Sequence, residues 1–212
     1  MAWRGAAVLL TLGLVGGGVG YTAAAVSAPT TSNPGPATAV SASNPSYPLD
    51  PPLNVLPDPD VPPPLAPPFS TRPVSLGQAP FAVTFPVPAT WQRFDTNAGE
   101  ARFTPPGNPS HTYSIRVELV GSQTRTIQQS VTDRVTDLQG DTRIEDLQIL
   151  AQADDSLIAS FVLDGFRIVS VLRWVSPRGT PAAEVEISAS GRMRDRPGLE
   201  ALAELVARRI RP

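Results

Sequence analysis

The sequence predicts an α+β fold: an antiparallel β-sheet with two main helices packed on one face, preceded by an apolar N-terminal segment and a proline-rich linker. Several runs in the C-terminal part alternate apolar and polar residues, which is typical of half-buried antiparallel strands. Two other segments carry apolar residues at helical spacing. In addition, Asp164-Gly165 separates two β-rich runs, and Asp-Gly favours the type I′ turn of a tight hairpin. Strands followed by amphipathic helices indicate a sheet covered by helices.

The hairpin from Ser156 to Val175 is the central element of this prediction. A turn at Asp164-Gly165 pairs Leu163 with Phe166 and Phe161 with Ile168 across the two strands. We expect one face to be the core face and its members to be buried: Leu157, Phe161, Leu163, Phe166, Ile168, Leu172 and Trp174. A slip of one residue would exchange the two faces, so burial of one face fixes the register.

The opposite face of the same hairpin is apolar as well, with arginines beside the apolar residues. It carries Ile158, Val162, Arg167, Val169, Val171 and Arg173, and also Val175. An apolar surface of this kind is either covered by another part of the chain or is a docking patch for a partner. The apolar second half of the linker is the expected cover. The candidate docking patch consists of Ile158, Val162, Arg167, Val169, Val171 and Arg173.

The composition excludes several classes of function. The 212 residues carry a net charge of −2, so nothing in the overall charge favours nucleic acid. All 17 basic residues are arginine, which excludes a Schiff-base or P-loop lysine. Cysteine is absent and His111 is the only histidine, which excludes disulfides, thiolate metal sites and multi-histidine metal sites. We therefore expect no metal and no cofactor.

Residues 1–28 are predicted to target the chain to a membrane. Arg4 precedes an apolar run over residues 5–26, and about 20 apolar residues suffice to cross a bilayer as a helix. The small residues before Pro29 also fit cleavage by signal peptidase. The segment is thus either an uncleaved single-pass anchor, which we favour, or the signal of a secreted protein. In both cases Arg4 indicates a cytoplasmic N-terminus and an exported remainder.

Residues 29–73 form the predicted linker, which contains 15 of the 25 prolines. Such a run favours polyproline II and acts as a semi-rigid spacer. The sequence Pro-Asp-Val-Pro at 59–62 also fits the P-x-x-P pattern of ligands for proline-recognising modules, but we favour the spacer. The second half of the linker is more apolar than a spacer requires, which indicates that it lies against the folded domain.

Residues 74–212 are predicted to be the folded domain. We expect strands at 81–85, stopped by Pro86 and Pro88, and at 91–94, 100–104, 113–119 and 144–151. The hairpin follows, and then a strand at 183–189 with Glu184 and Glu186 facing outward. A first helix is expected over 123–138, with Ser122 or Thr124 as its cap. A second helix is expected from Asp195 to the end of the chain, with Leu199, Leu202, Val206 and Ile210 on its apolar stripe.

The opening of this domain, Phe-Ala-Val-Thr-Phe-Pro-Val-Pro-Ala-Thr-Trp at 81–91, resembles the start of PsbP-like α/β domains. These domains include the extrinsic oxygen-evolving protein of photosystems and LpqN-type lipoproteins of high-GC bacteria. The resemblance covers residues 74–212 and extends to the closing amphipathic helix. It implies an exported accessory or binding domain, and it provides no catalytic motif. The chain lacks the lipobox cysteine of the lipoproteins, so lipid attachment is not implied.

Other polar residues are interpreted as structural. His111 lacks a nucleophile motif for general-base chemistry, so we interpret it as a strand-end residue. Asp154-Asp155 is interpreted as a solvated turn, and Asp133 and Asp137 as an exposed helix face. Glu184 and Glu186 with Arg167 and Arg173 are interpreted as a cross-strand charge ladder on a solvent-exposed face.

Two classes of function remain from the sequence. The favoured one is a non-catalytic, membrane-tethered extracytoplasmic domain that binds an envelope or membrane protein or another envelope component. The alternative is a small-molecule carrier or an enzyme with a site between the sheet and the helices. A filled interface between sheet and helices favours the first class, whereas a cavity of several hundred Å³ lined by convergent polar groups favours the second.

Overall fold

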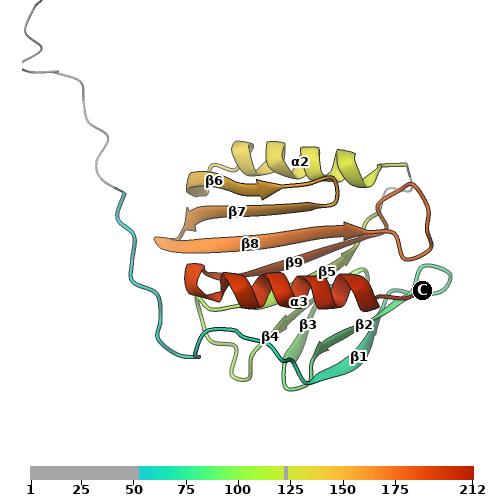
Figure 1. Cartoon of the computed structure of the whole chain (residues 1–212), viewed down its shortest axis with the longest axis horizontal. Coiled ribbons are helices and arrows are strands. Elements are labelled where there is room, and N and C mark those ends of the chain that lie inside the picture. The colour runs from blue at the N-terminus through green and yellow to red at the C-terminus, as the bar shows by residue number, and fades with distance from the viewer. Residues whose placement is uncertain (1–52, 122–123) are drawn as a thin grey trace, which may run out of the picture. The chain divides into compact units, whose positions relative to one another are not determined.

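The structure is a computed structural model that describes residues 53–121 and 124–212. Its largest element is a seven-stranded antiparallel sheet with the strand order β3-β4-β5-β9-β8-β7-β6 (Figure 1). Its strands are β3 (Gln92–Asn97), β4 (Glu100–Thr104), β5 (Ser114–Leu119), β6 (Ile144–Gln152), β7 (Ser156–Leu163), β8 (Phe166–Val175) and β9 (Val185–Arg192). The helices are α2 (Ile127–Gly140) and α3 (Arg196–Arg209), and a short 3₁₀ turn, η1 (Met193–Asp195), precedes α3. The predicted α+β class is therefore confirmed.

A second, two-stranded sheet pairs β1 (Thr71–Leu76) with β2 (Val83–Pro88). The strand does not stop at Pro86, which pairs with Pro73 inside the ladder, but it does end at Pro88, the second of the two prolines expected to stop it. A two-stranded sheet has free edges, and an edge position does not require an N–H donor. The same geometry explains how Pro73 lies within a strand rather than at the end of the linker.

The hairpin of β7 and β8 has the predicted register. Leu163 faces Phe166, Phe161 faces Ile168 and Leu157 faces Leu172. Asp164 and Gly165 have φ angles of 52° and 80°, as a type I′ turn requires at both central positions. The turn residues thus fix the pairing that the sequence predicts.

The two helices lie on opposite faces of the sheet, so the expectation that both pack on one face is wrong. Successive side chains of a strand point to opposite faces. On β8, Val169 and Val171 belong to the cluster that contains the buried side chains of α3. Leu172 and Trp174 instead belong to the cluster around Val131 of α2. Because β8 is apolar on both faces, its sequence supports a helix on either side.

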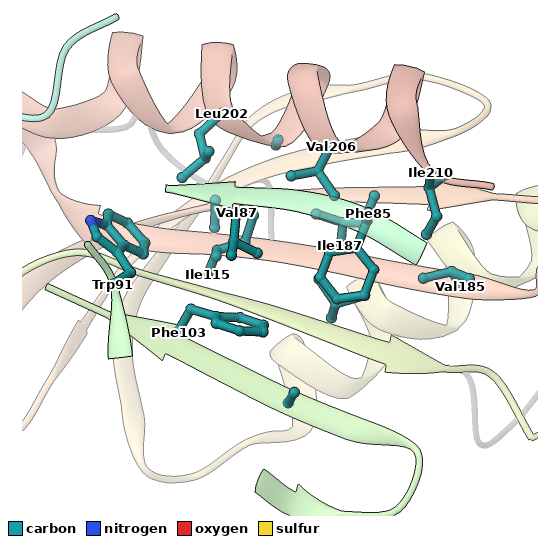
Figure 2. Close-up of a cluster of buried hydrophobic side chains, with 14 of the residues drawn as sticks. Phe85, Val87, Trp91, Phe103, Ile115, Val185, Ile187, Leu202, Val206 and Ile210 are labelled. Carbon is teal, nitrogen blue, oxygen red and sulfur yellow. The ribbon is translucent and has the colours of Figure 1, made fainter. Parts of the chain in front are cut away.

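The larger cluster is the main core and lies between α3, β2 and one face of the sheet. Figure 2 shows Phe85 and Val87 of β2 directed toward the same interior as Phe103, Ile115 and Ile187. Leu202, Val206 and Ile210 close the cluster from α3 and the residue that follows it. Phe85 meets Phe103 edge to face, with ring centroids 6.0 Å apart. The interface between α3 and the sheet is therefore filled by side chains.

α2 covers the smaller cluster of Leu157, Leu172, Trp174, Ala183 and its own Val131. The helix begins one turn later than predicted, because Thr126, rather than Ser122 or Thr124, is its cap. The Thr126 hydroxyl accepts from the Gln129 amide, and the Gln129 side chain accepts from the Thr126 amide. This capping box satisfies two amides at the start of the helix.

The compact unit starts near Pro52 rather than at Val74. Residues 53–69, which we call the strap, run along the domain and lead into β1, which begins at Thr71. Leu65 and Phe69 of the strap pack against the main core. The prediction that the second half of the linker lies against the domain is thus confirmed, and the boundary at residue 74 falls inside a strand.

The expected membrane segment at 1–28 and the first half of the linker lie outside the described residues. Among residues 53–121 and 124–212, neither helix is long and apolar enough to span a bilayer.

Candidate functional site

The six residues of the predicted docking patch do not form one exposed surface. Val162, Val169 and Val171 are at most 3% exposed. Val169 and Val171 are covered by α3, whereas we expected the linker to be the cover. Ile158, Arg167 and Arg173 remain half-buried. The apolar character of this face of the hairpin is therefore explained by the main core.

The arginines of this face have structural partners. Arg167 forms an ion pair with Asp146 of β6, and Arg173 lies 2.8 Å from Glu204 of α3. The pairing with Arg167 holds the pKa of Asp146 below its usual value. These pairs join β8 to β6 and to α3, so the expected charge ladder of both arginines with Glu184 and Glu186 is not formed.

Glu186 is buried instead of facing outward, with 8% of its surface exposed. It accepts hydrogen bonds from Arg116 at 2.9 Å and from Arg134 of α2 at 2.5 Å. The indole Nε1 of Trp174 donates to its other oxygen at 3.1 Å. These donors satisfy the carboxylate, as a buried charge requires. Glu186 thus joins the sheet to α2.

A polar groove lies between α2 and the sheet beside Glu186, with a volume of about 310 Å³. We call it the α2 groove; its charged lining residues are Glu118, Arg125, Asp133, Arg134, Asp137 and Glu186. Within this lining, the Nε of Arg125 lies 3.1 Å from a carboxylate oxygen of Asp133. Burial raises the pKa of Glu118, and the neighbouring Glu186 and Glu100 add to this effect against the opposing charge of Arg116. The groove is a concave, charged surface that the sequence did not predict.

A second candidate feature is the pair of Arg192 and Asp195, which binds the backbone of the strap and which we call the clamp. Arg192 is 1% exposed and Asp195 is 0% exposed. The Nε of Arg192 lies 2.6 Å from one oxygen of Asp195, and its Nη2 lies 2.9 Å from the other. Its Nη1 donates to the carbonyls of Pro59 at 2.6 Å and Pro62 at 3.0 Å. One guanidinium therefore binds a carboxylate and the proline-rich backbone together.

The carboxylate of Asp195 completes the clamp from the start of α3. It accepts from the Leu65 amide at 3.0 Å and from the Arg192 amide at 3.1 Å. The hydrogen bonds from Arg192 to Asp195 raise the pKa of Arg192, so the guanidinium stays protonated. Further on, the Leu65 carbonyl approaches Gly198 so closely that any Cβ at that position would overlap with it. Glycine is required there by the close approach of the strap.

The first part of the strap contacts the turn of the central hairpin. The Leu56 amide donates to the Gly165 carbonyl at 2.7 Å. The ring of His111 stacks on Phe166, with centroids 3.8 Å apart. His111 therefore has a packing contact beside the turn, but it lies in an exposed turn with a φ of 53° rather than at a strand end, since β5 begins at Ser114. The strap is held at its beginning by the hairpin turn and along its length by the clamp.

The sequence held little signal for the clamp. Arg192 and Asp195 were visible only as charges near the start of the last helix, and their partners are backbone groups some 130 residues earlier. Backbone partners leave no pattern of side chains to detect. The apolar residues of the linker indicate that it contacts the folded domain, but they do not indicate which part of the domain it contacts.

The described residues contain no group of three or more side chains suited to holding a metal ion. Asp154 and Asp155 lie on the exposed turn between β6 and β7, and Asp155 pairs with Arg173. No known protein family matches the chain, and no curated protein is significantly similar to it.

Proposed function

We propose that the chain is a non-catalytic, membrane-tethered extracytoplasmic domain that binds an envelope or membrane protein or another component of the cell envelope. The observation that carries the proposal is the clamp on the strap. A spacer that only provides reach requires no buried arginine for its backbone. The Arg192 side chain is only 1% exposed, and it donates hydrogen bonds to the strap carbonyls of Pro59 and Pro62. The clamp supports a role in which the strap is a fixed part of the folded domain and not only a spacer.

The α2 groove is the binding surface in this proposal. It is concave, and its rim carries both signs of charge from α2 and the sheet. A protein surface or a polar envelope component suits such a lining, because interface rims are polar and hydrated. The PsbP-like resemblance of residues 74–212 points to the same class of accessory or binding domain and remains part of the proposal.

Intact-mass measurement on fractionated cells tests the tether. We expect full-length protein that sediments with membranes and is released only by detergent. A mass that begins at residue 29 in the soluble exported fraction would show that the chain is a cleaved, secreted protein. That result would reject the tether and leave the binding surface to be tested separately.

Cross-linking of the tagged full-length chain in membranes tests the binding surface. We expect Asp137→Arg, which reverses a charge at the rim of the α2 groove, to remove the cross-linked species seen with the wild-type chain. Asp95→Arg on β3 is the matched control, because Asp95 is exposed and lies outside the groove. Equal recovery of the same species from both variants would exclude the groove as the binding surface.

A second candidate is a small-molecule carrier or an enzyme with its site in the same groove. The interface between α3 and the sheet is filled, which favours the binding domain, whereas the groove of about 310 Å³ between α2 and the sheet is within the usual range for ligand sites and favours this second candidate. Native mass spectrometry of the full-length chain distinguishes this candidate. A stoichiometric small molecule that is lost in Asp137→Arg and retained in Asp95→Arg would favour the carrier over the protein-binding domain.

A further inference from the structure

A separate pocket of about 420 Å³ lies at the end of the sheet where β5 terminates and β9 begins. Its wall is mainly apolar and is formed by Phe81, Leu119, Val120, Ala182 and Ala183. Figure 1 shows the loop between β8 and β9 at this end of the fold, near the C-terminus. The pocket adjoins the α2 groove at Val120 and Gly121, and its other lining residues are different.

Arg178 holds the two sides of this pocket together. Its Nη2 donates to the carbonyls of Pro80 at 2.8 Å and Ala82 at 3.1 Å, which flank Phe81. Its guanidinium carbon lies 5.8 Å from the centre of the Phe81 ring, within the range of a cation–π contact. Phe81 is 52% exposed, yet its backbone is fixed on both sides by this arginine. The pocket wall is therefore positioned from a distant loop.

The charge of Arg178 is neutralised inside the same loop. Its Nη1 lies 2.9 Å from Glu184, which also accepts from the hydroxyls of Ser176 and Thr180. Burial desolvates Glu184, but these hydrogen bonds outweigh that effect and lower its pKa. The carboxylate thus stays ionised and paired. A charged ligand would gain no net charge complementarity from the pair, whereas an apolar ligand would cover the exposed ring and the aliphatic wall.

We infer that this pocket binds a small, uncharged apolar molecule, with Phe81 as its principal contact. Three features support the assignment. The volume is that of small-molecule sites, most of the wall is apolar, and the polar groups at the rim are already paired with one another. This site goes beyond the tethered binding role, and its lining differs from that of the α2 groove apart from Val120 and Gly121.

Photolabelling of the full-length chain tests the inference. The probe is 3-trifluoromethyl-3-phenyldiazirine, an uncharged aromatic molecule, applied to the protein in amphipol. We expect saturable labelling of the peptides that contain Phe81 and residues 178–184, mapped by mass spectrometry. Labelling of the apolar residues 5–26 reports partition of the probe and is expected not to saturate.

The matched variants are Phe81→Ala and Phe94→Ala, since both remove an exposed phenylalanine and only Phe81 lines the pocket. Phe81→Ala is expected to weaken saturable labelling about tenfold, which corresponds to about 1.4 kcal/mol, because the variant loses the aromatic ring that contacts the probe. Phe94→Ala is expected to retain the wild-type curve. Labelling that does not saturate at residues 178–184, or that is unchanged by Phe81→Ala, overturns the inference. An equal loss in both variants, with unfolding curves like the wild type, overturns it as well.

Discussion

Arg192 and Asp195 form an ion pair in which neither side chain is more than 1% exposed. Arg192 closes β9, and Asp195 stands immediately before α3. Because their remaining polar atoms bind the backbone of the strap, one pair joins the sheet, the helix and the proline-rich segment. Tyr113 lies against the pair, with the guanidinium carbon 5.5 Å from its ring. Burial and the charge of Asp195 raise the pKa of that tyrosine, so it stays neutral.

Arg192→Ala is expected to destabilise the protein by about 3–5 kcal/mol, because it leaves Asp195 buried without its partner. The strap should also become accessible to proteases, with early cleavage within residues 53–65. Urea unfolding and limited proteolysis of the full-length chain measure the two effects.

Arg194→Ala is the control for this variant. Arg194 also contacts the Pro59 carbonyl, but its side chain is 33% exposed. We expect a loss of less than about 1 kcal/mol, as is usual for exposed ion pairs. If the two variants lose the same stability, the buried pair is not what holds the strap.

Gly198→Ala tests the close approach of the strap to α3. Alanine is favoured over glycine in a helix by about 1 kcal/mol, so helix propensity alone predicts stabilisation. The Leu65 carbonyl occupies the space of the new methyl group, so the substitution must displace the strap. We therefore expect a lower midpoint of thermal unfolding.

Gly140→Ala is the matched control for Gly198→Ala, because Gly140 is also helical and a Cβ there meets nothing within 4 Å. It should leave the midpoint unchanged or raise it slightly. A Gly198→Ala variant that behaves like Gly140→Ala would show that the strap is not seated on α3 in solution.

The register of the central hairpin was predictable because Asp164-Gly165 determines it locally. The placement of the two helices was not predictable from the sequence. β8 carries apolar residues on both faces, and its hydrophobic periodicity does not determine which helix covers which face of the sheet. Of the candidate site, only the contact of the linker with the domain was predicted. The buried role of Glu186 depends on Arg116 and Arg134, which come from a strand and a helix far away in the sequence.

Phe161→Ala and Phe103→Ala compare the two sides of the fold. The sequence places Phe161 in the core, but the structure leaves it half-buried opposite Ile168, whereas Phe103 is 0% exposed. Phe103→Ala should cost about 3–5 kcal/mol, the usual range for a buried phenylalanine. Phe161→Ala should cost clearly less in the same denaturant titration. An equal cost would mean that another part of the chain covers Phe161.

Glu118→Gln tests the electrostatics of the α2 groove. Burial raises the pKa of Glu118 above its usual value of 4.5, so the folded state binds this proton more tightly than the unfolded state. Its contribution to stability is therefore fully present below the unfolded pKa and is lost as the pH rises through the folded pKa. Glutamine does not ionise, so the variant should match the wild type at about pH 3.5 and be more stable at about pH 8.

The gain from Glu118→Gln should stay below about 1 kcal/mol, because the side chain is 38% exposed and lies 3.0 Å from Arg116. Urea unfolding across this pH range measures it. Glu145→Gln on β6, where the carboxylate is exposed, controls for the general effect of removing a negative charge. If Glu118→Gln is less stable than the wild type at pH 8 while Glu145→Gln is not, the ion pair with Arg116 outweighs the cost of burying the charge. The groove would then favour an ionised Glu118, whose pKa would lie below 4.5 rather than above it.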